Sequence, residues 1–177
     1  MPKPPLLPAE IVRRLIRVAR FHGYSVLIFT GLFTLGALAL GDFKSTLICA
    51  LITAAGAFEV NGARLLARGE SRGIVWLVRS PIYLLTVLLL YVGWQLLTYN
   101  SAQAQQVLDP AMKAAGMQEQ LDALGATQED LKHMTSVLYF ASYGLVALVS
   151  FFYLGALALY YHRRRGAVLA AFSPIKK

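Results

Sequence analysis

Two charged side chains lie within otherwise apolar sequence and are the ones best placed to do chemistry: Glu59 and Arg79. A lone carboxylate or guanidinium in hydrocarbon is expensive to desolvate, so such residues face the protein interior and pair with an opposite charge. A pair of this kind either holds helices together or lines a path for protons, ions or solutes. The positions of the two residues decide which role is open to them.

Both residues are ten positions from Gly69, one on each side. If two membrane helices form an antiparallel hairpin that turns at this glycine, residues equally far from the turn lie at the same depth. Glycine suits the turn because it tolerates the left-handed backbone conformation that ends many helices. We therefore expect Glu59 and Arg79 to form an intramembrane polar pair, with Asn61 and Ser80 satisfying the remaining donors and acceptors.

Three interpretations of the pair remain open. In the first, which we prefer, the pair staples the hairpin and specifies its register. In the second, it lines a path for protons, ions or a solute. In the third, Arg79 extends along its helix to the lipid headgroups and never meets Glu59.

The other reactive side chains form no recognisable site. His22, His133 and His162 are far apart in the sequence and are expected at membrane edges on different sides, so we predict no metal or haem. The single cysteine, Cys49, has apolar neighbours and is expected to pack rather than react. The sequence contains no glycine-rich phosphate loop, G-x-S-x-G or H-E-x-x-H motif. We therefore expect no catalytic activity and no cofactor.

The composition is that of an integral membrane protein. Of the 177 residues, 57% are hydrophobic, which is too apolar for a soluble domain of this length. A hydrocarbon core about 30 Å thick needs roughly 20 apolar residues in each helical span. Four apolar runs, two of them extended to take in Glu59 and Arg79, predict an all-α fold, a single membrane domain over residues 1–177, with four transmembrane helices at 24–41, 45–66, 73–97 and 134–161.

The distribution of charge predicts the orientation of these spans. Basic residues of short loops stay on the cytoplasmic side, and here they gather before the first span, between the second and third, and after the fourth. Both termini are therefore predicted to be cytoplasmic, in what we expect to be a bacterial inner membrane. The net charge of +8 then indicates anionic lipid headgroups as a partner, and no nucleic acid.

Residues 8–21 predict an amphipathic helix that lies in the plane of the membrane interface. Apolar residues such as Ile11, Leu15 and Val18 share one side of this helix, and basic residues share another. The basic residues are expected to contact lipid headgroups: Arg13, Arg14, Arg17 and Arg20. A mobile gate, or a helix that docks a partner, is the alternative.

The remaining segments add detail to this architecture. Small residues recur every four positions in the second span, at Ser45, Cys49, Thr53 and Ala57, and should let another helix approach closely. Pro81 is expected to kink the third span. Residues 100–133 are expected to form a short helical loop on the outer side, and 162–177 a basic cytoplasmic tail.

These features favour a small non-enzymatic membrane protein that acts through helix association. It would work as a homo-oligomer or as an accessory subunit of a membrane complex. The first alternative is an oligomeric channel or transporter with Glu59, Asn61 and Arg79 near the permeation path. The second alternative is an enzyme that acts on a lipid-soluble substrate.

Overall fold

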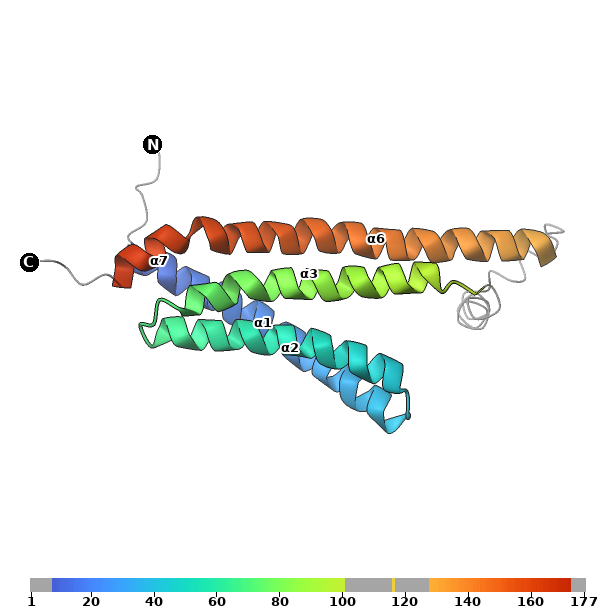
Figure 1. Ribbon diagram of the computed structural model, residues 1–177, viewed down its shortest axis with the longest axis horizontal. Helices are drawn as coiled ribbons and strands as arrows, with labels where there is room; N and C mark the ends of the chain where they lie inside the picture. The colour runs from blue at the N-terminus through green and yellow to red at the C-terminus, as the bar shows by residue number, and fades with distance from the viewer. Residues whose placement is uncertain (1–7, 101–115, 117–127, 173–177) are drawn as a thin grey trace, which may run out of the picture. The chain divides into compact units, whose positions relative to one another are not determined.

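A computed structural model describes residues 8–100, 116 and 128–172 of the chain. The regular elements in this part of the chain are all α-helices: α1 (Pro8–Ala39), α2 (Phe43–Ala67), α3 (Gly73–Leu97), α6 (Gln128–Arg163) and α7 (Arg165–Phe172) (Figure 1). Four of them, α1, α2, α3 and α6, are long and apolar enough to cross a bilayer. The all-helical fold with four candidate spans agrees with the sequence, and the chain is an integral membrane protein.

The helix bounds follow the predicted spans closely at α2 and α3. α3 begins and ends at the predicted residues, 73 and 97, and α2 covers the predicted 45–66 with a short extension at each end. α6 begins at Gln128, close to the helix start that Thr127 and Asp130 indicate, so it extends before the predicted span 134–161 into the last residues of the predicted outer loop 100–133. Most of that loop lies outside the described residues.

The N-terminal segment was predicted to be a separate interfacial helix, but it is continuous with the first span. The predicted helices 8–21 and 24–41 form the single 32-residue helix α1. The apolar stripe of its first half is buried against other helices, through Val12, Leu15 and Ala19. The four arginines predicted to contact lipid are exposed on its other side: Arg13, Arg14, Arg17 and Arg20.

The chain divides into two compact units, and each unit contains parts of α3 and α6. The first unit comprises the described parts of 1–88 and 150–177, and the second is formed by the described parts of 89–149. The main core of the first unit joins α1, α2, α3, α6 and α7, and its buried members are Val12, Leu15, Ala19, Ala63, Leu66, Ile74, Leu77, Tyr161 and Val168. Through Val168, the predicted basic tail 162–177 contributes a packed helix, α7, to this core.

Two glycines end the helices that precede the short turns. Gly41 follows α1 with φ 73° and Gly69 follows α2 with φ 83°, both in the left-handed region. At each turn the glycine N–H and the next residue's N–H donate to carbonyls of the last helical turn, which satisfies groups that would otherwise lack partners. The prediction that Gly69 ends its helix is confirmed.

The turn between α1 and α2 also contains a residue that caps the second helix. The Asp42 side chain accepts hydrogen bonds from the Ser45 hydroxyl and the Ser45 backbone N–H. These bonds, first that from the hydroxyl and then that from the backbone, hold the pKa of the Asp42 carboxyl below its usual value. The cap fixes where α2 begins and therefore where its polar residues lie along the helix.

Close helix contacts in the first unit are made by glycines rather than by the predicted column of small residues. A Cβ on Gly56 of α2 would lie 2.8 Å from the Leu27 backbone nitrogen and 2.9 Å from the Gly23 carbonyl oxygen, both in α1. Of the predicted column, Thr53 does face α1 and hydrogen-bonds Thr30 at 2.8 Å, whereas Ala57 is exposed. α1 and α2 therefore cross in backbone contact at Gly23 and Gly56.

A second glycine contact joins α2 to α3. A Cβ on Gly73 would lie 2.6 Å from the Gly62 carbonyl oxygen and 2.8 Å from the Leu66 nitrogen. Further along the pair, the Ser80 hydroxyl donates to the Ala55 carbonyl at 2.8 Å. α3 continues as a helix through the buried Pro81, which lies next to this bond.

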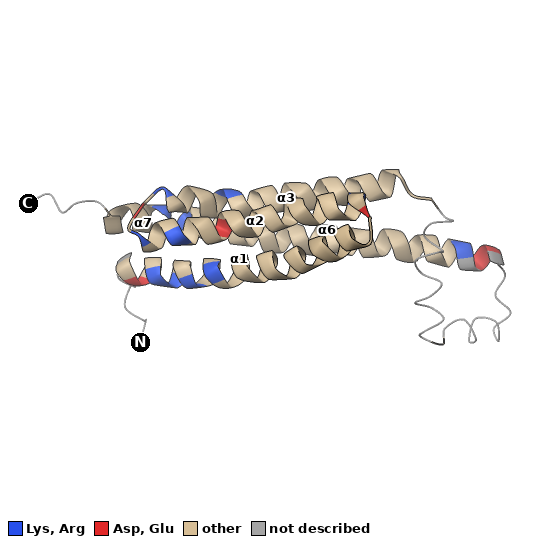
Figure 2. Ribbon diagram, turned by 90° about the horizontal axis from the view of Figure 1, so that it is seen from below, with Lys and Arg blue, Asp and Glu red and all other residues tan. Residues whose placement is uncertain are grey.

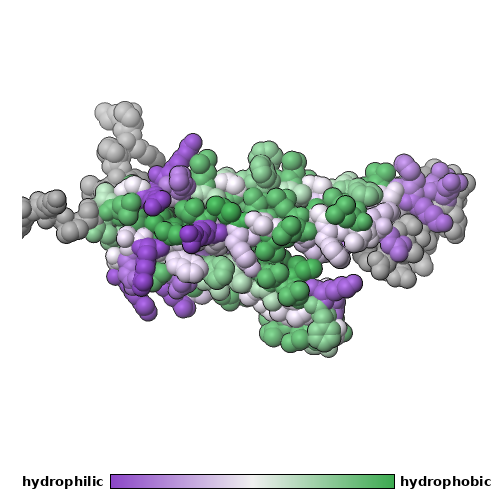
Figure 3. Space-filling model, in the orientation of Figure 1, coloured by the Kyte–Doolittle hydropathy of each residue, from purple (hydrophilic) through white to green (hydrophobic). Residues whose placement is uncertain are grey.

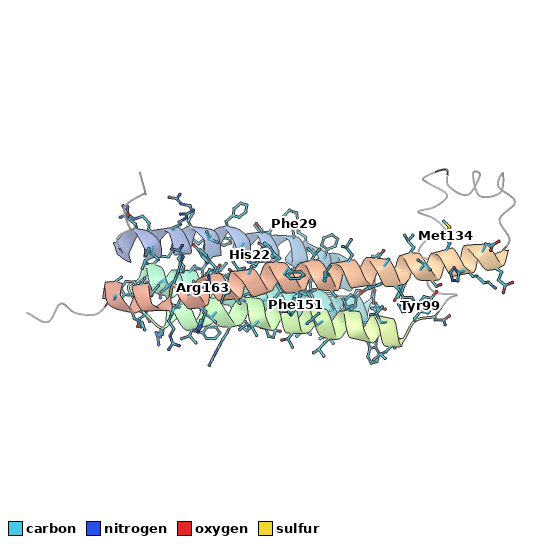
Figure 4. All side chains as sticks on the ribbon, turned by 90° about the horizontal axis from the view of Figure 1, so that it is seen from above. His22, Phe29, Tyr99, Met134, Phe151 and Arg163 are labelled. Carbon is cyan, nitrogen blue, oxygen red and sulfur yellow. The ribbon has the colours of Figure 1, made fainter. Side chains whose placement is uncertain are left out.

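The second unit is held by polar aromatic side chains where α3 ends and α6 begins. The Tyr139 hydroxyl donates to the Gln95 side-chain oxygen at 3.2 Å, and the Gln95 side-chain nitrogen donates to the Tyr91 hydroxyl at 2.9 Å. The Tyr99 ring, labelled in Figure 4, packs at a tilt against that of Tyr139, with centroids 4.9 Å apart. These rings give the short second unit its own packing.

Gly56→Ala is expected to lower the thermal unfolding midpoint of the detergent-solubilised protein. The added Cβ would meet two backbone atoms of α1, and overpacking of this kind costs about 1–3 kcal/mol because neither helix backbone can yield locally. Gly93→Ala is the matched control, because nothing lies within 4 Å of a Cβ at that position of α3. Equal midpoints for the two variants would contradict the close crossing.

Candidate functional site

Glu59 is the most deeply buried acidic or basic residue in the described part of the chain. Glu59 is 1% exposed, although it lies in the apolar helix α2. It is one helical turn before Ala63, a buried member of the main core. The close crossing of α1 and α2 is next to it: a Cβ on Gly23 would lie 3.2 Å from the Glu59 Cβ. The carboxylate is therefore removed from both water and lipid.

Both carboxylate oxygens of Glu59 have a partner from another helix. Nδ1 of His22, on α1, lies 2.5 Å from Oε2. The hydroxyl of Tyr161, on α6, donates to Oε1 at 2.5 Å. The three residues belong to the first unit, and together they join α1, α2 and α6 at one point; Figure 4 labels His22 on α1.

This arrangement meets the requirement that a buried charge be paired and hydrogen-bonded. When the His22 ring is protonated, imidazolium and carboxylate form a pair with no net charge, which is cheaper to bury than a lone carboxylate. The Tyr161 hydroxyl, itself 0% exposed, supplies the second donor. The His22 side chain is 13% exposed, and its ring lies 5.7 Å from that of Tyr153 between centroids. His22 is thus the member of the cluster closest to the surface.

The predicted pair of Glu59 with Arg79 is not formed. Arg79 is exposed, and among the described residues the ion pairs of the structure are His22 with Glu59 and Arg72 with Glu70. One reason is register: Ala55 meets Ser80 and Gly62 meets Gly73, so the hairpin is centred between Ala67 and Arg68 rather than on Gly69.

The second reason is rotation about the helix axis. Successive residues of an α-helix point about 100° apart, because 3.6 residues complete one turn. Ser80 faces α2 and is buried, so its neighbour Arg79 points elsewhere. Register and rotation therefore both hold the guanidinium away from the carboxylate, contrary to the prediction.

The supporting polar residues are also placed differently from their prediction. Ser80 is buried as expected, but it donates to the Ala55 carbonyl and so joins α2 to α3 without touching the carboxylate. Asn61 is exposed on α2. Arg79 lines a surface hollow together with apolar residues of α3 and two basic residues of the chain's last described segment.

His22 and Tyr161 are the site residues that the sequence reasoning missed. For His22 the sequence contained a signal. Gly41 marks the turn between α1 and α2, and Gly23, the residue after His22, is as many positions before this turn as Glu59 is after it. Tyr161 is 102 residues away from Glu59 in the chain, and no spacing rule connects the two. Within the described residues, no group of three or more His, Cys, Asp or Glu side chains converges in a way that could hold a metal ion.

No protein-family model matches the chain, and no curated protein or solved structure matches it either. The geometry of the buried carboxylate is therefore the best guide to function.

Tyr161→Phe is expected to destabilise the protein by about 1–3 kcal/mol, because it removes a single donor and leaves a buried carboxylate oxygen unsatisfied. The loss is measured as a change in unfolding free energy in detergent. Tyr24→Phe is the matched control, since Tyr24 is an exposed tyrosine of α1.

A double variant tests whether the loss arises at the carboxylate. In a Glu59→Leu background no acceptor remains for the hydroxyl, so adding Tyr161→Phe should cost nothing further. A loss of the same size in both backgrounds would mean that the hydroxyl acts through packing and not through Glu59.

Proposed function

We propose that the chain is a non-enzymatic membrane protein that acts through helix association, as a homo-oligomer or as an accessory subunit of a membrane complex. The observation that carries the proposal is that the buried carboxylate is satisfied within the chain. His22 and Tyr161 occupy its two oxygens, so the most buried charge of the described residues is used to hold helices together. A group meant to bind a passing ion or proton would need a side open to a path.

Glycines that face open space support the same proposal. Gly56 and Gly73 are packed against neighbouring helices, but nothing lies within 4 Å of a Cβ built on Gly36, Gly144 or Gly155. Helices associate in lipid chiefly where small residues let two backbones approach, because lipid and apolar side chains attract a helix equally. These glycines leave room for helices of another chain.

The exposed surface of the helices is apolar over most of its area. Large side chains that are more than half exposed include Phe29, Phe33, Phe151 and Phe152. Figure 3 shows apolar residues over much of the face in view, while hydrophilic residues gather where α1 begins and near both ends of α6. This surface suits contact with lipid or with other membrane helices.

We assign the basic end of the first unit to the cytoplasmic side, in a bacterial inner membrane. Lys and Arg residues gather there on α1, on the turn after α2 and at the end of α6 (Figure 2). The positive-inside tendency of membrane proteins favours this orientation, with both termini inside. Arg13, Arg14, Arg17 and Arg20 are then placed to contact anionic headgroups from the exposed side of α1.

The channel alternative requires Glu59, Asn61 and Arg79 to line one path, and their positions do not favour this. Glu59 is enclosed, whereas Asn61 and Arg79 are exposed, and the hollow at Arg79 is lined by neither of the other two. The enzyme alternative would need a polar pocket open to the headgroups with reactive groups in it. Helix association requires neither feature.

The orientation predicts which turn is accessible from outside the cell. In a Cys49→Ala background, Leu40→Cys reports on the turn after α1 and Ser71→Cys on the turn after α2, and neither change alters a charge. A membrane-impermeant maleimide should label residue 40 in intact cells and residue 71 only after the membrane is made permeable. The reverse pattern would contradict the orientation.

Association predicts that the wild-type protein is recovered as an oligomer, or together with another membrane protein, after mild detergent extraction. Gly144→Leu and Gly155→Leu should weaken this assembly at least several-fold, because a leucine would hold an approaching helix away. Sedimentation in density-matched detergent measures the assembly. Gly166→Leu is the matched control, since its Cβ would also meet open space but lies on the short helix α7.

Two results would overturn the proposal. One is a wild-type protein that is monomeric at every protein-to-detergent ratio and is recovered from native membranes without a partner. The other is ion or proton flux into proteoliposomes that is altered by Glu59→Gln or Arg79→Ala while the assembly stays intact. The second result would favour the channel alternative.

A further inference from the structure

A hollow on the surface of the first unit combines two arginines with an apolar wall. α3 provides Ile74, Val75, Val78 and Arg79, and the end of α6 and the start of α7 provide His162 and Arg165. The three basic side chains belong to exposed residues. The hollow is therefore open to whatever surrounds the helices at this level.

The positive charge in this hollow is not balanced by acidic side chains of the described part of the chain. The half-buried acidic residue of the nearby turn, Glu70, is paired with Arg72 at 2.5 Å. The buried one, Glu59, is paired with His22. The neighbouring Arg164 differs from Arg165, since its guanidinium lies over the Tyr160 ring, 4.7 Å from the centroid. Within the described residues, no ion pair joins Arg79 or Arg165 to a carboxylate.

The depth of the hollow sets what kind of anion can balance it. Arg79 is six residues from the start of α3, so its Cα lies about 9 Å inside that end of the helix. Long arginine side chains at such positions extend toward the headgroup layer. The guanidinium groups are then at the level of lipid phosphates, with Ile74 and Val75 beside them and Val78 nearest to the first acyl carbons, because these residues precede Arg79 on α3.

We propose that this hollow is a binding site for an anionic phospholipid. Arg79 and Arg165 bind the phosphate oxygens, because a guanidinium donates two parallel hydrogen bonds to a phosphate. His162 donates a further bond from its ring. The lipid glycerol lies against Val75 and the upper acyl chain packs against Val78, which a soluble anion would leave bare. Basic pockets between membrane helices bind anionic headgroups in this manner.

The site is tested by native mass spectrometry of the full-length protein in detergent, with phosphatidylglycerol titrated into it. The wild type should retain one phosphatidylglycerol at concentrations where phosphatidylcholine is lost. Arg79→Gln and Arg165→Gln should each weaken this binding by about tenfold or more, because each removes a bidentate, charge-assisted contact. Arg79→Lys should fall between the wild type and Arg79→Gln, because it keeps the charge but loses the fork.

The control variants separate a specific site from general attraction to a basic surface. Arg68→Gln removes the same charge from an exposed arginine of the turn after α2, which does not line the hollow, and should leave binding within about twofold of wild type. An equal loss in Arg68→Gln and the two test variants would overturn the proposal. Since both tested arginines are exposed, their variants should keep the wild-type unfolding midpoint. If one variant is destabilised, the lipid binding of the other variant tests the proposal.

A free anion is distinguished from a lipid by competition. Inorganic phosphate at physiological concentration should fail to displace phosphatidylglycerol, because it has no acyl chain to contact the apolar wall. Displacement by phosphate alone would show that the hollow binds a soluble anion and would overturn the assignment to lipid.

Discussion

A carboxylate buried in an apolar helix is the constraint on which the first unit depends. Glu59 is 1% exposed, and an unpaired charge at such a place is too costly for a helix bundle to keep. α2 offers no donor of its own on that face, so the donors come from α1 and α6 as His22 and Tyr161. Satisfying one side chain therefore fixes three helices at a common level.

This polar contact and the glycine crossing beside it need one another. The Glu59 Cβ lies only 3.2 Å from the place that a Cβ on Gly23 would occupy, so His22 can reach the carboxylate because the two backbones touch there. A larger residue at Gly23 or Gly56 would separate α1 from α2 and lengthen the bond. Conversely, the pair gives a reason for the helices to meet at this register and not one turn further along, where apolar packing alone would discriminate less.

The sequence predicts well those features that depend on local composition. Hydropathy locates α2 and α3 almost to the residue, and glycine locates the turn at Gly69, because both signals lie in the segment concerned. The partners of Glu59 depend instead on which face of one helix meets another. Distance from a turn gives the depth of a residue but not the direction in which its side chain points. Measured from Gly69 this distance selected Arg79 as the partner of Glu59. Measured from Gly41 it selects Gly23, the residue next to His22. Tyr161 comes from a distant segment that no such rule reaches.

The correction at Arg79 changes what this residue implies. As the partner of Glu59 it would have completed an internal pair, and its charge would have raised no further question. Register and rotation instead leave the guanidinium outside the core, with its charge unbalanced among the described residues, while His22 and Tyr161 satisfy the carboxylate. A cation at the edge of a membrane takes its counter-charge from the nearest anions, and those are lipid phosphates. The internal satisfaction of Glu59 is thus consistent with the role in lipid binding that we propose for Arg79.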